Sequence, residues 1–201
     1  LGESVAAVCL DACKMAKECG ITVSCDLNYR KNLWTTEQAK ATMERLLEYV
    51  DILIANEEDA EKVLGISAPD TDVTAGKLNK EGYVSVAKQI CRKYGIPTVA
   101  ITLRQSISAS DNNWSGMLYT NDTAYFSREY AVHLVDRVGG GDSFGAGLIF
   151  AIGHGFEPQK CIDYAVAASC LKQTMEWDVN LSTEKEIMTL VNGDGSGRVQ
   201  R

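Results

Sequence analysis

The stretch Asp136-Arg137-Val138-Gly139-Gly140-Gly141-Asp142-Ser143-Phe144-Gly145-Ala146-Gly147 decides most of what the sequence says about fold and chemistry. Its three consecutive glycines lie between a predicted strand and a predicted helix, so backbone N–H groups there can approach a ligand closely. The helix N-terminus adds partial positive charge, which suits a phosphate. The Asp142 carboxylate would repel such an anion, but its presence makes sense if it accepts a proton from a hydroxyl attacking the phosphate. From spacing alone, a helix cap at Asp142 and a tight glycine turn explain the stretch equally well.

Two other phosphate-binding motifs fit this stretch less well. A Walker A motif requires Lys and then Ser or Thr after its last glycine, whereas Gly145 is followed by Ala146 and Gly147. The dinucleotide-binding fingerprint has a different glycine spacing and does not belong so late in a chain. The sequence therefore predicts a phosphate site of another type.

Helical and strand patterns alternate on the N-terminal side of this stretch. The predicted elements are helix 5–16, strand 21–25, helix 35–49, strand 51–55, helix 56–65, helix 83–94 and strand 97–103. Thr35 and Gln38 form a predicted capping box, and the polar residues 66–82 are a predicted surface excursion. Buried strands alternating with helices indicate a largely parallel sheet, whose ligands gather at the carboxyl ends of the strands.

The period changes to alternation over residues 105–135, where Asp-Asn-Asn and Asn-Asp turns predict an antiparallel meander. Helices are predicted after it at 142–154, 158–175 and 183–191. The fold class is therefore α/β, with an antiparallel insertion in a mostly parallel sheet.

Composition excludes several classes of protein. The chain has 201 residues, of which 45% are hydrophobic and 23% charged, and this length and composition suit one folded domain. Its net charge of −7 argues against nucleic acid or an anionic membrane as the main partner. Seven cysteines without a C-x-x-C pair, and only two histidines, make a zinc site improbable. Most of the cysteines are predicted to be small buried apolar residues in a reducing, cytoplasmic compartment.

The block from Gly139 to Asp142 resembles the GAGD signature of the ribokinase-like (PfkB) carbohydrate kinases, with Gly140 in place of the usual alanine. Asp136 and Phe144 match the flanks of that signature. Further matches follow the expected order, namely Asp26-Leu27-Asn28-Tyr29-Arg30 with Leu33-Trp34, and Asn56-Glu57-Glu58-Asp59 after a strand. The resemblance covers nearly the whole chain and is closest to the 2-keto-3-deoxygluconate kinases.

The resemblance implies a doubly wound, ribokinase-like sheet with helices on both faces, and ATP and Mg²⁺ as cofactors. It implies that Asp142 is the general base that deprotonates the sugar hydroxyl. Gly139, Gly140 and Gly141 would form the anion hole for the transferring phosphoryl group.

The resemblance also assigns the sugar acid to particular residues. Arg30, with Asn28 beside it, would hold the acceptor, because a guanidinium can grip a carboxylate or hydroxyl pair in two places. Without the resemblance, a surface ion pair is the simpler interpretation of Arg30. Asp178 would bind hydroxyl groups of the acceptor, although Trp177 occupies a position where relatives commonly have glycine.

Further residues resemble the nucleotide and metal region of the family. Asn56 to Asp59 resembles N-x-x-E, whose members act on magnesium and phosphate largely through water; here Asp59 replaces the glutamate. Asn56 could equally be an N-cap, followed by a solvated first turn. Thr102 and Arg104 lie where the family has T-x-G at the nucleotide loop, with Arg104 in place of the glycine.

These matches predict an ATP-dependent kinase that phosphorylates a sugar acid, most simply 2-keto-3-deoxygluconate at its 6-hydroxyl. Two alternatives stay open: a PfkB kinase for fructose, ribose or another small sugar, and a non-catalytic nucleotide-binding fragment. Residues 1–201 are expected to be a single kinase domain in its C-terminal portion, because the N-terminal strand and lid of the family have no counterpart here. We therefore expect little activity from the chain by itself, and a possible homo-oligomer only in the full-length protein.

Overall fold

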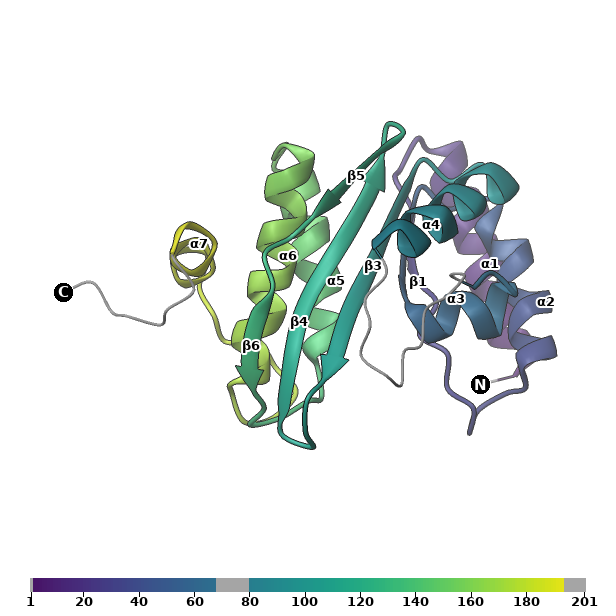
Figure 1. Cartoon of the computed structure of the whole chain (residues 1–201). Coiled ribbons are helices and arrows are strands. Elements are labelled where there is room, and N and C mark those ends of the chain that lie inside the picture. The colour runs from purple at the N-terminus through teal and green to yellow at the C-terminus, as the bar shows by residue number, and fades with distance from the viewer. Residues whose placement is uncertain (1, 68–79, 194–201) are drawn as a thin grey trace. The chain divides into compact units, whose positions relative to one another are not determined.

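The computed structural model of the chain describes residues 2–67 and 80–193. Figure 1 shows its elements, which follow the order α1 (Glu3–Glu18), β1 (Ser24–Asp26), α2 (Thr36–Leu47), β2 (Ile52–Asn56), α3 (Glu57–Leu64), α4 (Lys80–Tyr94), β3 (Thr98–Ser106), β4 (Asp111–Thr120), β5 (Thr123–Phe126), β6 (Tyr130–His133), α5 (Gly140–Gly153), α6 (Pro158–Gln173) and α7 (Glu184–Asn192). The predicted alternation is confirmed. Most of the predicted excursion at 66–82 lies outside the described residues.

The strand order is β1-β2-β3-β4-β5, and β6 pairs with β4. Strands β1, β2 and β3 are parallel, whereas β4 and β6 are antiparallel, as the change of sequence period predicts. In the parallel part, Asn56 lies in register with Thr102 at the carboxyl ends of β2 and β3. Two residues that were predicted to act on the nucleotide are therefore neighbours on adjacent strands.

Contacts divide the chain into two compact units, and β3 passes from the first to the second after Thr102. The core of the first unit centres on β2, whose residues from Ile52 to Ala55 are all buried. Helix α2 begins at the predicted capping box, in which the Thr35 side chain accepts from the Gln38 N–H. Both α2 and α4 contribute buried apolar side chains, which include Ala39, Met43, Leu47, Val86, Ala87 and Ile90.

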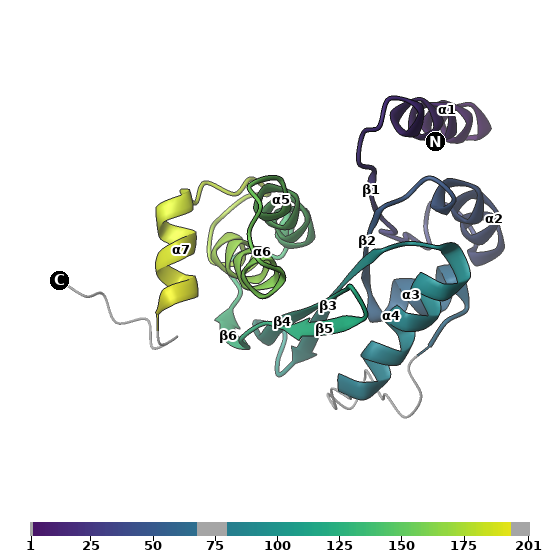
Figure 2. The same ribbon diagram turned by 90° about the horizontal axis from the view of Figure 1, so that it is seen from above.

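The second unit is held together by α5 and α6, which make the most extensive helix contact of the chain. Both helices lie on the same face of β4 and β6 (Figure 2). Gly147 allows α5 to approach α6, because a Cβ there would lie 3.1 Å from the Cα atom of Ala165. Gly116 on β4 is similarly close to α6, where its Cβ would meet Val166 at 2.9 Å. Small residues thus set the spacing between strand and helices.

Two groups of residues complete the comparison with the sequence. The prediction that most cysteines are buried is wrong: Cys161 and Cys170 are buried, while the other five are exposed or half-buried. Cys9 and Cys13 lie on α1, whose only buried residue is Leu10, Cys19 is its C-cap, and Cys25 lies on β1, the end strand of the sheet. An apolar residue is buried only where another element packs against it. His133 and His154 are both exposed. No helix in the described parts of the chain is long and apolar enough to span a membrane.

Candidate active site

Residues 139–141 are three consecutive glycines, which are called the glycine loop below. The conformation of this loop depends on Gly139, the N-cap residue of α5. Gly139 has φ +80°, in the left-handed region that glycine adopts without steric cost. A Cβ at this position would lie only 2.0 Å from the backbone oxygen of Asp178. Glycine is therefore required for two independent reasons, and the loop that carries Asp178 packs directly against the glycine loop.

The first turn of α5 presents free amide groups. Ser143 N donates to Gly139 O at 2.9 Å, and Gly140 N makes a long 3.4 Å contact with Arg137 O. Within residues 2–67 and 80–193, the N–H groups of Gly141 and Asp142 have no hydrogen-bond acceptor. Unpaired N–H groups at a helix start carry the positive end of the helix dipole, so groups of this kind can bind an anion.

Asp142 lies in this first turn with its side chain exposed. The N-cap is Gly139 rather than Asp142, and the Asp142 carboxylate accepts no hydrogen bond from the described residues. The alternative in which Asp142 merely caps the helix is thus not what the structure has. Its oxygen lone pairs remain available to a ligand.

An open cleft of about 390 Å³ begins at Asp142 and runs between α5, α6 and the segment before α7. It is lined by Asp142, Ser143, Ala146, Gly147, Phe150, Tyr164, Ala168, Asp178, Asn180, Ser182 and Ile187. Two predicted site residues, Asp142 and Asp178, therefore line one cleft. Polar side chains gather at the end with Asp142, while Phe150 and Tyr164, which the sequence analysis missed, stack on each other with ring centroids 5.2 Å apart. Phe150 lies four residues after Ala146, and Tyr164 lies four residues before Ala168, so each pair shares one face of its helix. This spacing was the sequence signal that could have indicated the two rings.

The loop that carries Asp178 keeps a glycine-like backbone although it has no glycine. Trp177 adopts φ +68°, and its side chain is 76% exposed. The substitution of Trp for glycine therefore leaves a left-handed turn in place before Asp178. Asn180 fixes the following residues, because its Nδ2 donates to Ala168 O at 3.0 Å and its Oδ1 accepts from Ser182 N at 2.8 Å.

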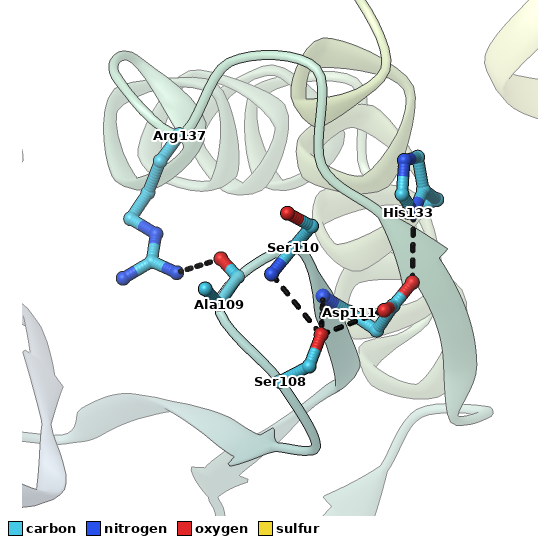
Figure 3. A network of polar contacts seen from close by, with 6 residues as sticks. All are labelled: Ser108, Ala109, Ser110, Asp111, His133 and Arg137. Atoms are coloured by element: carbon cyan, nitrogen blue, oxygen red, sulfur yellow. Dashed lines mark hydrogen bonds and ion pairs between the residues drawn. The ribbon is translucent and has the colours of Figure 1, made fainter.

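Arg104 lies half-buried on β3 and does not line this cleft. The turn after β3 nevertheless contacts the segment that leads into the glycine loop, because Arg137 Nη2 donates to Ala109 O at 3.3 Å (Figure 3). Ser108 shapes the turn: its Oγ accepts from the backbone N–H groups of Ser110 and Asp111 and donates to the Asp111 carboxylate. Arg137 thus links the turn that follows β3, the strand of Arg104, to the segment that leads into the glycine loop.

His133 contacts the same turn, with Nδ1 2.7 Å from Asp111 Oδ1 (Figure 3). Hydrogen bonds from Ser108 and His133 lower the pKa of Asp111. Both side chains of the ion pair are more than half exposed, so the pair contributes little to stability. His133 is thus an exposed residue of β6 that contacts the turn.

In the first unit, Asn28 and Arg30 lie in the loop after β1. Asn28 has φ +41°, and its N–H donates to Asp26 Oδ1 at 3.1 Å. Arg30 is exposed, and its Nη1 donates to Tyr29 O at 3.0 Å. It forms no ion pair with any described residue, so the structure lacks the surface ion pair that was the alternative interpretation.

Asp59 accepts a hydrogen bond from the backbone of the loop after β1. Its side chain is only 4% exposed, and its Oδ1 accepts from Tyr29 N at 3.2 Å. Burial, and then the nearby Asp26 carboxylate, raise the pKa of Asp59 from 3.8 to about 6. Asn56 Oδ1 accepts from Asp59 N at 2.7 Å, so Asn56 is the N-cap of α3, which was one of the two interpretations. The described residues contain no cluster of three or more His, Cys, Asp or Glu side chains that could hold a metal ion.

Comparison with known proteins gives consistent matches. The family model described as pfkB family carbohydrate kinase matches residues 2–176. The chain is 26% identical over 182 residues to a 2-dehydro-3-deoxygalactonokinase of Haloferax volcanii, covering 90% of this chain and 51% of that protein. The crystal structure of a 2-dehydro-3-deoxygluconokinase from Thermotoga maritima is 50% identical with a TM-score of 0.90, covering 96% of this chain and 57% of that one.

A more distant likeness concerns a protein of E. coli described as a ribokinase II and solved in complex with ATP and Mg²⁺. It is 21% identical with a TM-score of 0.66, and covers 90% of this chain and 51% of that chain. The chain thus spans about half the length of the proteins that it matches.

Proposed function

The chain belongs to the pfkB family of carbohydrate kinases, and we propose that it transfers the γ-phosphoryl group of ATP to a sugar acid, converting 2-keto-3-deoxygluconate to its 6-phosphate. One observation carries the proposal: Asp142 and Asp178 line a single cleft, and Asp142 lies in the first turn of α5, where its own N–H and that of Gly141 have no acceptor among the described residues. The proposed unit is one kinase domain, in which residues 1–201 are the C-terminal portion.

Asp142 is the proposed general base. The acceptor hydroxyl gives its proton to the carboxylate while its oxygen attacks the γ-phosphorus, the bond to the β–γ bridging oxygen breaks, and ADP leaves. The amides of the loop from Gly139 to Gly141, together with that of Asp142, stabilise the negative charge on the transferring phosphoryl group. Because Gly141 and Asp142 N–H have no acceptor in the described chain, they need no rearrangement to do so.

The shape of the cleft suits a nucleotide. Phosphates would lie at the amides of the α5 N-terminus, and the base would pack against the apolar end at Phe150 and Tyr164. Thr102, Arg104 and Asn56 remain proposed nucleotide contacts at the strand ends. Mg²⁺ would neutralise charge on the phosphates. Since the described residues offer no carboxylate cage, we propose that phosphates and water supply most of its ligands, with Asn56 and Asp59 acting indirectly.

The proposed acceptor contacts are Arg30, Asn28 and Asp178. Arg30 has a fork of N–H groups that is free of any described ion-pair partner, and such a fork binds a carboxylate in two places. This feature supports a sugar acid over fructose or ribose, which carry no carboxylate. The 50% identity to a 2-dehydro-3-deoxygluconokinase supports the same choice.

The test is a coupled ADP-release assay on the protein that contains this chain, with 2-keto-3-deoxygluconate, fructose and ribose as acceptors. We expect turnover with the sugar acid, and a loss of about 10²- to 10⁴-fold in kcat for Asp142→Asn with ATP binding retained. Asp11→Asn is the matched control, since it changes another exposed carboxylate on α1. Unchanged turnover in Asp142→Asn would refute the mechanism, and a preference for fructose or ribose would refute the acceptor.

A further inference from the structure

Two polar side chains are buried on α6 directly beside the glycine loop. Ser169 is fully buried and Gln173 is 3% exposed. Most of their buried neighbours on the helix are apolar, among them Ile162, Ala165, Val166, Ala167 and Cys170. Burying a hydroxyl or an amide costs free energy unless it is hydrogen-bonded, so the partners of these two residues indicate what they do.

Their hydrogen bonds form a relay toward Gly140. Gln173 Nε2 donates to Ser169 O at 3.3 Å and to Ser169 Oγ at 3.4 Å. Ser169 Oγ in turn donates to Gly140 O at 2.7 Å. A hydroxyl that accepts from one side can direct its single proton to the other, so the amide of Gln173 orients the donor that holds Gly140.

The same residue, Gln173, also holds the other end of the loop. Its backbone oxygen accepts from Val135 N at 2.9 Å and from Asp136 N at 3.3 Å. Its side chain packs under Gly140, where a Cβ would lie 3.2 Å from Gln173 Cγ. The segment from Val135 to Gly140 is thus fixed at both ends by the last turn of α6.

This anchoring determines where the amides point. In a trans peptide the C=O and N–H bonds point in opposite directions, and the described chain has no cis peptide. Since Ser169 draws the Gly140 carbonyl toward α6, the N–H of Gly141 in the same peptide is directed away from α6. It is one of the two N–H groups in the first turn of α5 that have no acceptor within the described residues.

We propose that Ser169 and Gln173 are positioning residues for phosphoryl transfer: they fix the Gly140–Gly141 peptide so that its N–H faces the anion. The inference rests on the proposed function of the glycine loop. Neither residue lines the cleft, so both act through Gly140. Losing them misplaces an amide that stabilises the transition state, and a displacement of about 1 Å can cost about 100-fold in rate.

The test compares three variants of the protein that contains this chain. Ser169→Ala removes the donor to Gly140, and Gln173→Met removes Nε2 while keeping an unbranched chain under Gly140. Thr174→Ala is the matched control, because Thr174 Oγ1 also donates to a carbonyl of α6, Leu171 O, at 2.7 Å but lies outside the relay. We expect kcat to fall about 10- to 100-fold in the first two variants, with KM for ATP within about twofold and the control within about twofold throughout.

A second measurement does not depend on turnover. Amide ¹H–¹⁵N spectra should show the Gly141 resonance shifted in Ser169→Ala and Gln173→Met, and unshifted in Thr174→Ala. If the wild-type protein transfers no phosphoryl group, the proposed function fails while the spectra still test the positioning role. Unchanged kcat or an unshifted Gly141 resonance in a folded variant would overturn the inference. Should Ser169→Ala not fold, Gln173→Met carries the same comparison.

Discussion

Alanine substitutions at the three consecutive glycines should have three different effects on the free energy of unfolding. At Gly139, alanine must adopt φ +80° and place its Cβ 2.0 Å from Asp178 O. At Gly140, the Cβ would lie 3.2 Å from Gln173 Cγ, a contact that a side chain can relieve. At Gly141, no atom beyond the adjacent residues and the neighbouring backbone of α5 lies within 4 Å of the Cβ, and the backbone is helical. The same substitution should therefore change the free energy of unfolding differently at three positions that have the same residue in the sequence.

The magnitudes follow from these geometries. The left-handed backbone costs alanine about 1–2 kcal/mol, and relieving a 2.0 Å overlap with a backbone oxygen moves the loop of Asp178, so Gly139→Ala should cost at least about 2 kcal/mol. Gly141→Ala should gain up to about 1 kcal/mol, because alanine is the better helix former. The two variants should therefore differ by about 3 kcal/mol, with Gly140→Ala between them.

Urea unfolding followed by circular dichroism measures these differences, because the free energy of unfolding extrapolates linearly with denaturant. Gly141→Ala is the matched control, since it introduces the same methyl group two residues away. If Gly139→Ala were as stable as Gly141→Ala to within about 0.5 kcal/mol, the described contact between the glycine loop and the loop of Asp178 would be incorrect.

Two further predictions concern the residues that shape the site. Trp177→Gly should raise the free energy of unfolding by about 0.5–1 kcal/mol, because it removes a left-handed non-glycine residue whose side chain is 76% exposed; Trp177→Ala keeps the strain and should not stabilise, as thermal unfolding would show. The pKa of Asp59 is raised from 3.8 to about 6, so the folded chain binds this proton more tightly than the unfolded chain does. The free energy of unfolding therefore falls as Asp59 ionises between about pH 4 and pH 6. Asp59→Asn should therefore gain up to about 3 kcal/mol relative to wild type between pH 4 and pH 7, and a difference that does not change with pH would contradict this.

The sequence predicts the elements around the site because local signals agree with the packing. Thr35 and Gln38 form the expected capping box, and β2 is the buried strand that its apolar residues indicate. Asp142 and Asp178 lie on one cleft, although they are 36 residues apart in the sequence. This proximity was available only through the family resemblance, since no periodicity relates a helix start to a loop beyond the next helix.

Other features of the site depend on which atoms meet in three dimensions. Asn56 has the sequence context of both an N-cap and a nucleotide contact, and only its bond to Asp59 N shows that it caps α3. Replacing glutamate by Asp59 shortens the side chain, and the structure turns that carboxylate inward to hold Tyr29 N. A sequence pattern gives the type of residue at a position but not the direction of its side chain.

Gly140 shows most clearly why a motif match and a structure answer different questions. In the motif, glycine in place of alanine keeps the backbone and so resembles a neutral change. In the structure, the space that an alanine methyl would occupy borders the Gln173 side chain at 3.2 Å, and Gln173 also orients Ser169 toward Gly140. The residue at position 140 is therefore coupled to residues on the next helix, 29 and 33 positions later in the chain. Because contacting residues do not contribute additively to stability, the proposed anion loop has to be understood together with α6.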